Sequence, residues 1–119
     1  MTGKITTHVL DLSLGKPASD VLVELWRVGS ENLYRFIQAS YTNEDGRLSS
    51  PLLEGSNLKK GIYELRFHVG DYYRNRGLVG EEESFLDCVP VRFGVSLPNS
   101  HYHVPLLISP GGYSTYRGS

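Results

Sequence analysis

The sequence predicts an all-β domain, and three features of its pattern support this. Short apolar or alternating runs recur along the 119 residues, turn residues separate them, and almost nothing repeats at helical spacing. About eight such runs are typical of a sandwich or a barrel. We find no internal repeat or linker, so residues 1–119 are expected to form a single domain.

Four strands are expected in the N-terminal half, over residues 5–12, 21–28, 34–42 and 47–52. The first ends at Gly15-Lys16-Pro17. The third is followed by Asn43-Glu44-Asp45-Gly46, whose residue types tolerate a tight turn with positive φ. The fourth should be a short edge strand, because Pro51 has no N–H to donate to a ladder.

Four more strands are expected in the C-terminal half, over residues 62–69, 89–97, 102–108 and 113–117. The alternation in the first of these places Tyr63, Leu65 and Phe67 in the core. It also places His68 on the opposite, surface-facing side. The only expected helix is short, over residues 71–76. Asp71 lies near its N-terminus, where a negatively charged carboxylate stabilises a helix.

Charge and cysteine content narrow the classes of function. The net charge is -1, from 12 basic and 13 acidic side chains, which gives no electrostatic case for nucleic acid or an acidic membrane. No run approaches the roughly 20 apolar residues of a membrane helix. Cys88 is the single cysteine, so no intrachain disulfide forms, and it is expected to be a small buried hydrophobe. No apolar run follows Lys4, so we expect a cytoplasmic protein, or a peroxisomal one if the source is eukaryotic.

Metal and nucleophile motifs are weak in this chain. His101 and His103 share a strand face, and such a pair can chelate zinc. A third ligand would have to come from far along the chain, so no metal is expected. The sequence also has no G-x-S-x-G elbow and no phosphate-binding glycine loop.

Strand alternation places several polar side chains where an apolar pattern would be expected to continue. If the first, seventh and last strands lie in one sheet, His8, His103 and Tyr116 share a face, and Ser114 belongs to it too. The residues alone do not bring these strands together. Taken alone, each histidine is better explained as a solvated strand residue.

Two segments resemble the transthyretin-like family, and in particular its 5-hydroxyisourate hydrolase branch. Thr7-His8-Val9-Leu10-Asp11, followed by Gly15-Lys16-Pro17-Ala18, is similar to the family's opening signature. Residues 101–119 are similar to the closing signature, and their ending Tyr116-Arg117-Gly118-Ser119 separates the hydrolases from the hormone carriers. The likeness runs from Ile5 to the last residue. Residues 80–88 and Gly111 depart from the usual pattern, which concerns loop shape.

The resemblance implies a two-sheet antiparallel β-sandwich, transthyretin-like (prealbumin-like), with one short helix. It also implies a homotetramer, a dimer of dimers with its sites in a central channel. The first, seventh and eighth strands would face that channel. Neither a nucleic acid nor a membrane partner is implied.

The implied activity is hydrolysis of 5-hydroxyisourate to 2-oxo-4-hydroxy-4-carboxy-5-ureidoimidazoline in urate degradation, without a cofactor. His103 or His8 would act as the general base, and Arg47 would hold the developing oxyanion. Ser119 would orient a histidine or bind a substrate edge. Tyr116 and Ser114 would bind the flat heterocycle. In the carriers, lysine, glutamate and threonine stand at the positions matching His8, Arg47 and His103.

Two non-catalytic interpretations are open at this point. The same sandwich could be a transthyretin-type module that binds a small ligand, or a structural or adhesive domain. The two histidines, the arginine and the intact C-terminal motif favour the hydrolase, because the other interpretations give these polar residues no shared role.

Overall fold

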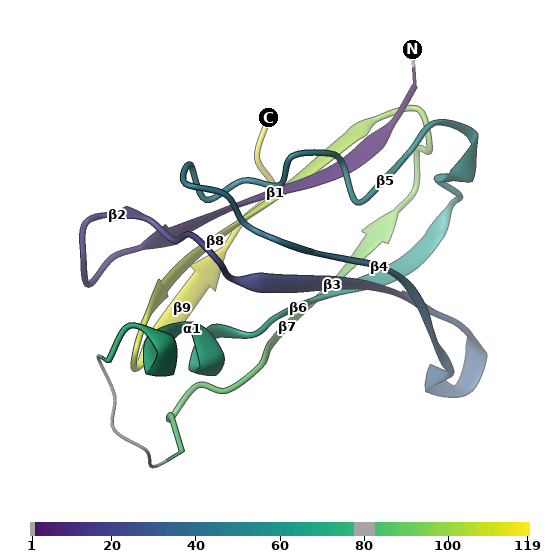
Figure 1. The fold of residues 1–119 in the computed structure, drawn as a ribbon. Coiled ribbons are helices and arrows are strands. Elements are labelled where there is room, and N and C mark those ends of the chain that lie inside the picture. The colour runs from purple at the N-terminus through teal and green to yellow at the C-terminus, as the bar shows by residue number, and fades with distance from the viewer. Residues whose placement is uncertain (1, 78–82) are drawn as a thin grey trace.

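A computed structural model describes residues 2–77 and 83–119, and across these residues the chain forms two β-sheets and one short α-helix (Figure 1). The sheets pack face to face, and the helix covers one end of the sandwich. The expected two-sheet sandwich with a short helix is confirmed. Within the described residues, no helix has the length and apolar character needed to cross a membrane.

The first sheet carries the candidate site. Its strand order is β2-β1-β8-β9, and β5 pairs with the other end of β1. The strands are β1 (Lys4–Asp11), β2 (Lys16–Pro17), β5 (Leu53–Glu54), β8 (His101–Ser109) and β9 (Gly112–Thr115). The sheet departs from purely antiparallel pairing, because β1 and β8 run parallel. Parallel neighbours need a long crossover, and the second sheet and the helix lie between these two strands in the chain.

The second sheet is antiparallel, in the order β4-β3-β6-β7. Its strands are β3 (Leu22–Val28), β4 (Tyr34–Tyr41), β6 (Gly61–Phe67) and β7 (Val89–Val95). Two 3-10 turns, η1 (Ser30–Asn32) and η2 (Gly55–Asn57), flank this sheet's strands. The helix α1 (Val69–Asn75) begins two positions before the predicted start.

Two strand predictions need correction. The strand predicted over residues 47–52 is wrong: Arg47 makes a single isolated bridge to His8, and pairing resumes only at β5. Pro51 has no N–H for a ladder, so this segment crosses β1 without pairing along it. The last strand ends at Thr115 rather than at residue 117, after which the chain bends and Gly118 meets His103.

The core lies between the sheets and has the predicted alternation. Tyr63, Leu65 and Phe67 are at most 1% exposed, and Ile5 and Leu106 of the first sheet are fully buried. Burying each such side chain stabilises the fold by about 1.5–3 kcal/mol. The inward set of β1 and β8 is therefore fixed, which directs the alternate side chains away from the core.

A buried carboxylate joins the first sheet to the helix. Asp11 is 1% exposed, and it accepts hydrogen bonds from the hydroxyls of Tyr72 at 2.7 Å and Tyr73 at 3.2 Å. It also accepts from the Ser13 backbone N–H at 2.9 Å. Burial alone would raise the pKa of Asp11, but the hydrogen bonds from Ser13, Tyr72 and Leu14 outweigh it and lower the pKa.

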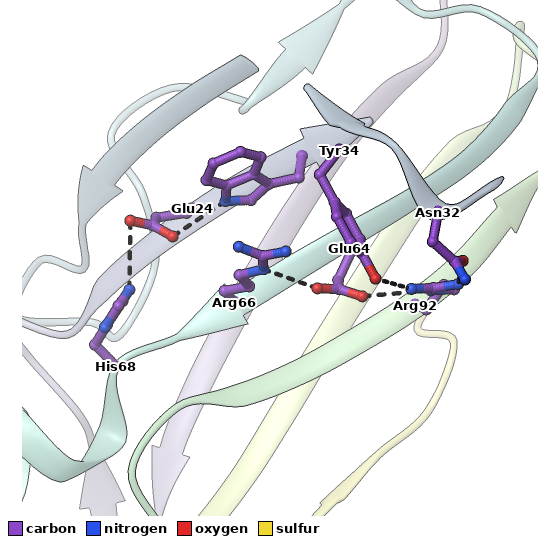
Figure 2. Close-up of polar contacts among 8 residues, drawn as sticks. Glu24, Asn32, Tyr34, Glu64, Arg66, His68 and Arg92 are labelled. Atoms are coloured by element: carbon purple, nitrogen blue, oxygen red, sulfur yellow. Dashed lines mark hydrogen bonds and ion pairs between the residues drawn. The ribbon is translucent and has the colours of Figure 1, made fainter. Parts of the chain in front are cut away.

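Charged side chains gather on the outer face of the second sheet (Figure 2). Glu64 is 6% exposed and accepts from Arg66 Nε at 2.8 Å and Arg92 Nε at 3.3 Å. His68 Nε2 lies 3.4 Å from Glu24 Oε2 on the same face. This confirms that His68 points away from the core, on the sheet opposite the candidate site.

The prediction that Cys88, just before β7, is buried is wrong. Cys88 is exposed rather than buried, because the buried position at the start of the strand belongs to Val89, which is 1% exposed. Of the unusual segment 80–88, residues 80–82 lie outside the described residues. Gly111 lies in the turn between β8 and β9, with open space where a side chain would begin.

Candidate active site

The pairing of β1 with β8 brings two distant polar segments together. In the parallel register Thr6 lies opposite His103, and His8 lies opposite Pro105. Their neighbours Thr7 and Val104 are buried, at 2% and 6% exposure. Thr6, His8 and His103 therefore lie on the face of the sheet that is turned away from the core.

A tight turn at Gly46 places Arg47 next to this face. Gly46 has φ +74, and its carbonyl accepts a hydrogen bond from Val9 N–H at 2.8 Å. A Cβ at Gly46 would clash with the Val9 carbonyl oxygen, so the turn can press against β1 only with glycine there. The next residue, Arg47, then forms a backbone bridge with His8.

The C-terminal residues lie along β8. Gly118 N–H donates to the His103 carbonyl at 2.8 Å, and Arg117 Nη2 donates to the His101 carbonyl at 3.3 Å. The Arg117 guanidinium also lies 4.3 Å from the centre of the Tyr102 ring. These contacts hold the last residue, Ser119, beside His103.

Strands β1 and β8, the segment after Gly46 and the C-terminal residues line a solvent-open cavity of about 250 Å³. Three predicted site residues line it together: Arg47, His103 and Ser119. His8 is adjacent, close enough to His103 and Arg47 to interact electrostatically with both. The remaining lining residues are Lys4, Thr6, Thr7, Leu48, Ser50 and His101.

Within one chain, the other two predicted residues lie elsewhere. Tyr116 lines a separate groove of about 300 Å³ at the edge of the sandwich, together with Phe93 and Tyr102. Ser114 lies opposite Leu107 in the hairpin of β8 and β9, outside the cavity lining. Their proposed part in substrate binding stays a prediction.

The surroundings of His103 and His8 favour their neutral forms. Burial is the largest cause of the lowered pKa of His103, and the positive charge of Arg47 and the neighbouring His101 and His8 add to it. Burial and Arg47 likewise lower the pKa of His8, with Asp45 opposing them. A neutral imidazole can accept a proton, so both side chains are suited to general-base chemistry.

Thr6 is a contact that the sequence did not single out. Its Oγ1 lies 2.6 Å from His101 Nε2 and 2.8 Å from His103 Nδ1. Alternation placed Thr6 on the same face as His8, but only the β1–β8 register places it against both histidines.

The Thr6 contacts also bear on the metal question. One nitrogen of His101 and one of His103 already face the same hydroxyl rather than a common vacant point. In the part of the chain that the structure describes, no three His, Cys, Asp or Glu side chains gather as a metal site would require.

Comparison with known proteins finds relatives over the full length of this chain. One similar protein is the 5-hydroxyisourate hydrolase of Halalkalibacterium halodurans, which is 56% identical to this chain over 119 residues. The alignment covers 100% of both chains. The crystal structure of an (S)-allantoin synthase matches with a TM-score of 0.91 at 42% identity, over 99% of this chain. This chain spans only 44% of that synthase.

A third similar protein is the 5-hydroxyisourate hydrolase of Klebsiella pneumoniae. Its structure matches with a TM-score of 0.81 at 34% identity, covering 98% of this chain and 99% of that one. The family model described as HIUase/Transthyretin matches residues 5–118. The chain therefore belongs to the HIUase/transthyretin family.

Proposed function

We propose that this chain is a hydrolase that opens the ring of 5-hydroxyisourate to give 2-oxo-4-hydroxy-4-carboxy-5-ureidoimidazoline in urate degradation. The observation that carries the proposal is the cavity in which His103, Arg47 and Ser119 meet beside His8. The full-length similarity to the Halalkalibacterium halodurans hydrolase, at 56% identity, supports it. The lone cysteine suits a reducing compartment, so we place the reaction in the cytoplasm.

The reaction breaks a cyclic acyl–nitrogen bond with water. Water is a poor nucleophile at neutral pH, so a base must take its proton as it attacks. We assign this role to His103, which lines the cavity and is neutral near pH 7. His8, on the neighbouring strand, positions the water or shares its proton.

Attack on the carbonyl carbon develops negative charge on its oxygen. Arg47 provides a guanidinium in the same cavity, and its paired N–H donors can stabilise that oxyanion. Ser119 brings a hydroxyl, which can orient a histidine or bind the edge of the substrate.

The assembly completes the proposal. We propose a homotetramer, a dimer of dimers, with the site-bearing sheets around a central channel. Tyr116 and Ser114 would then line the channel and contact the heterocycle. The half-open groove that contains Tyr116, Phe93 and Tyr102 lies at the free edges of β7 and β9 and suits association through those edges.

The test is a direct assay. Purified protein is added to freshly generated 5-hydroxyisourate, and the loss of its ultraviolet absorbance is followed against the spontaneous rate. A rate proportional to protein concentration is expected. An unchanged rate, with the compound bound but not consumed, would instead support a ligand-binding module.

A further inference from the structure

A single hydroxyl lies between two imidazole rings at the site. Thr6 Oγ1 is 2.6 Å from His101 Nε2 and 2.8 Å from His103 Nδ1, and the two ring centres are 5.9 Å apart. A threonine hydroxyl has one proton to donate and lone pairs with which to accept. It can therefore donate to one histidine while it accepts from the other.

In two arrangements Thr6 donates to one ring and accepts from the other, and these two differ in what His103 can do. If Thr6 donates to His101, it accepts from His103 Nδ1–H, which leaves Nε2 of His103 with a free lone pair. If Thr6 donates to His103 instead, the neutral ring carries its proton on Nε2. Only the first arrangement leaves a base at Nε2, because the hydrogen bond of one ring nitrogen sets the state of the other.

We propose that Thr6 is a positioning residue for His103, and that His101 determines the direction of its hydroxyl. His101 Nε2 accepts a hydrogen bond from the Thr6 hydroxyl. Thr6 then accepts from His103 Nδ1–H, and this leaves Nε2 of His103 free for the water. This inference rests on the proposed function, in which His103 is the general base.

The surrounding charges are compatible with this direction, because they disfavour a protonated His101. His101 lies at the exposed rim, and partial desolvation together with the positive charges of Lys4 and Arg117 lowers its pKa. His103 faces Arg47 and His8 as well as His101. A neutral His101 with its proton on Nδ1 accepts a hydrogen bond from Thr6 at Nε2. When His101 is protonated on both nitrogens, Nε2 becomes a donor, the Thr6 hydroxyl can donate to His103 Nδ1 instead, and in that arrangement the base at Nε2 is lost. Activity at acid pH thus depends on both histidines.

The first experiment changes the hydroxyl and its acceptor. Thr6→Val keeps the shape without the hydroxyl, and kcat should fall roughly ten- to a hundredfold with little change in KM. Thr6→Ser should restore most of the rate. His101→Gln keeps an acceptor near the Nε2 position and should stay active, while the acid limb of its pH profile should lose the His101 contribution. His101→Leu removes the acceptor and should resemble Thr6→Val.

A matched control uses a threonine outside the cavity. The Thr42 hydroxyl donates to the Ala18 carbonyl at 2.7 Å, and the side chain is 2% exposed. Thr42→Val should lower stability and leave the pH profile of kcat unchanged. A wild-type kcat and pH profile in folded Thr6→Val would overturn the proposal.

The second experiment reads the tautomer without turnover. Nitrogen-15 NMR of the wild-type protein should show His103 protonated on Nδ1 near pH 7, and Thr6→Val should lose this preference. A proton on Nε2 in the wild type would overturn the proposal. If the wild type failed to hydrolyse 5-hydroxyisourate, or if His103→Ala stayed active, the proposed function or the base assignment would fail. The NMR result would still decide whether Thr6 sets the tautomer.

Discussion

Gly118 holds His103 by its backbone and leaves no room for a side chain of its own. Its N–H donates to the His103 carbonyl at 2.8 Å, and a Cβ at this position would lie 2.5 Å from His103 Cδ2. That separation is shorter than real Cβ contacts allow. The imidazole and the C-terminal residues therefore fit together only with glycine at position 118.

Gly118→Ala should displace the His103 ring or the C-terminal residues. Small displacements of a catalytic group can cost about a hundredfold in rate. We expect kcat/KM to fall by about that factor, with a small change in the thermal midpoint because the residue lies outside the core. Gly111→Ala is the matched control, since a Cβ there meets nothing within 4 Å. Equal activity of the two variants would contradict the tight fit.

His103→Ala should abolish most catalysis while the fold persists. β8 keeps its buried side chains Tyr102, Val104 and Leu106, so packing is preserved. Loss of a general base typically costs a hundredfold or more. The measurement is kcat, with circular dichroism as the check on folding. His68→Ala, on the outer face of the other sheet, should retain the wild-type rate. Near-normal turnover in His103→Ala would remove His103 from the mechanism.

Arg47→Lys keeps the positive charge but loses the paired donors of the guanidinium. We expect kcat/KM to fall by roughly tenfold or more, because a lysine ammonium matches the oxyanion less well. Arg35→Lys on β4 of the other sheet is the control for a change of arginine to lysine. If Arg47→Lys is as active as the wild type, charge alone is sufficient and the paired-donor role is wrong.

Periodicity predicted most of the strands because the inward residues of each strand are apolar and alternate, as in Tyr63, Leu65 and Phe67. It failed over residues 47–52, where Leu48 and Leu52 give an apolar pattern without a pairing partner. Alternation singled out His103, and the resemblance added Arg47 and Ser119 to the residues that line the cavity. The Thr6 contacts depend on the β1–β8 register, which local patterns do not contain. Tyr116 lies beyond the end of β9 at Thr115, in a groove outside the cavity of one chain.

Asp11 should make stability depend on acid pH. Its folded-state pKa is lowered from the ordinary value of 3.8. Its stabilising contribution is therefore fully present above about pH 4 and is lost as the pH falls through the folded-state value. Asp11→Asn should cost about 1.5–3 kcal/mol at pH 7, the range for hydrogen bonds to a charged group. Urea unfolding at pH 7 and pH 3 measures both effects. The gap between Asp11→Asn and wild type should narrow at pH 3, and a constant gap would contradict the link to ionisation.

Truncation of residues 117–119 tests whether they are part of the site or only a frayed end. Chain ends usually tolerate truncation, but here Arg117 and Gly118 bond to β8 and Ser119 lines the cavity. None of the three is a core hydrophobe, so deleting residues 117–119 should cost little stability.

The same deletion should cost activity severely, since it removes the Gly118 bond to His103 together with the Ser119 hydroxyl. A tag attached after Ser119 should also impair the enzyme, because it crowds the cavity. Ser119→Ala removes the hydroxyl alone, so its rate should lie between those of the wild type and the deletion. Hydrolysis rates of the three proteins are measured, with thermal unfolding as the control. Full activity in the truncated and tagged proteins would show that Ser119 has no part in the site.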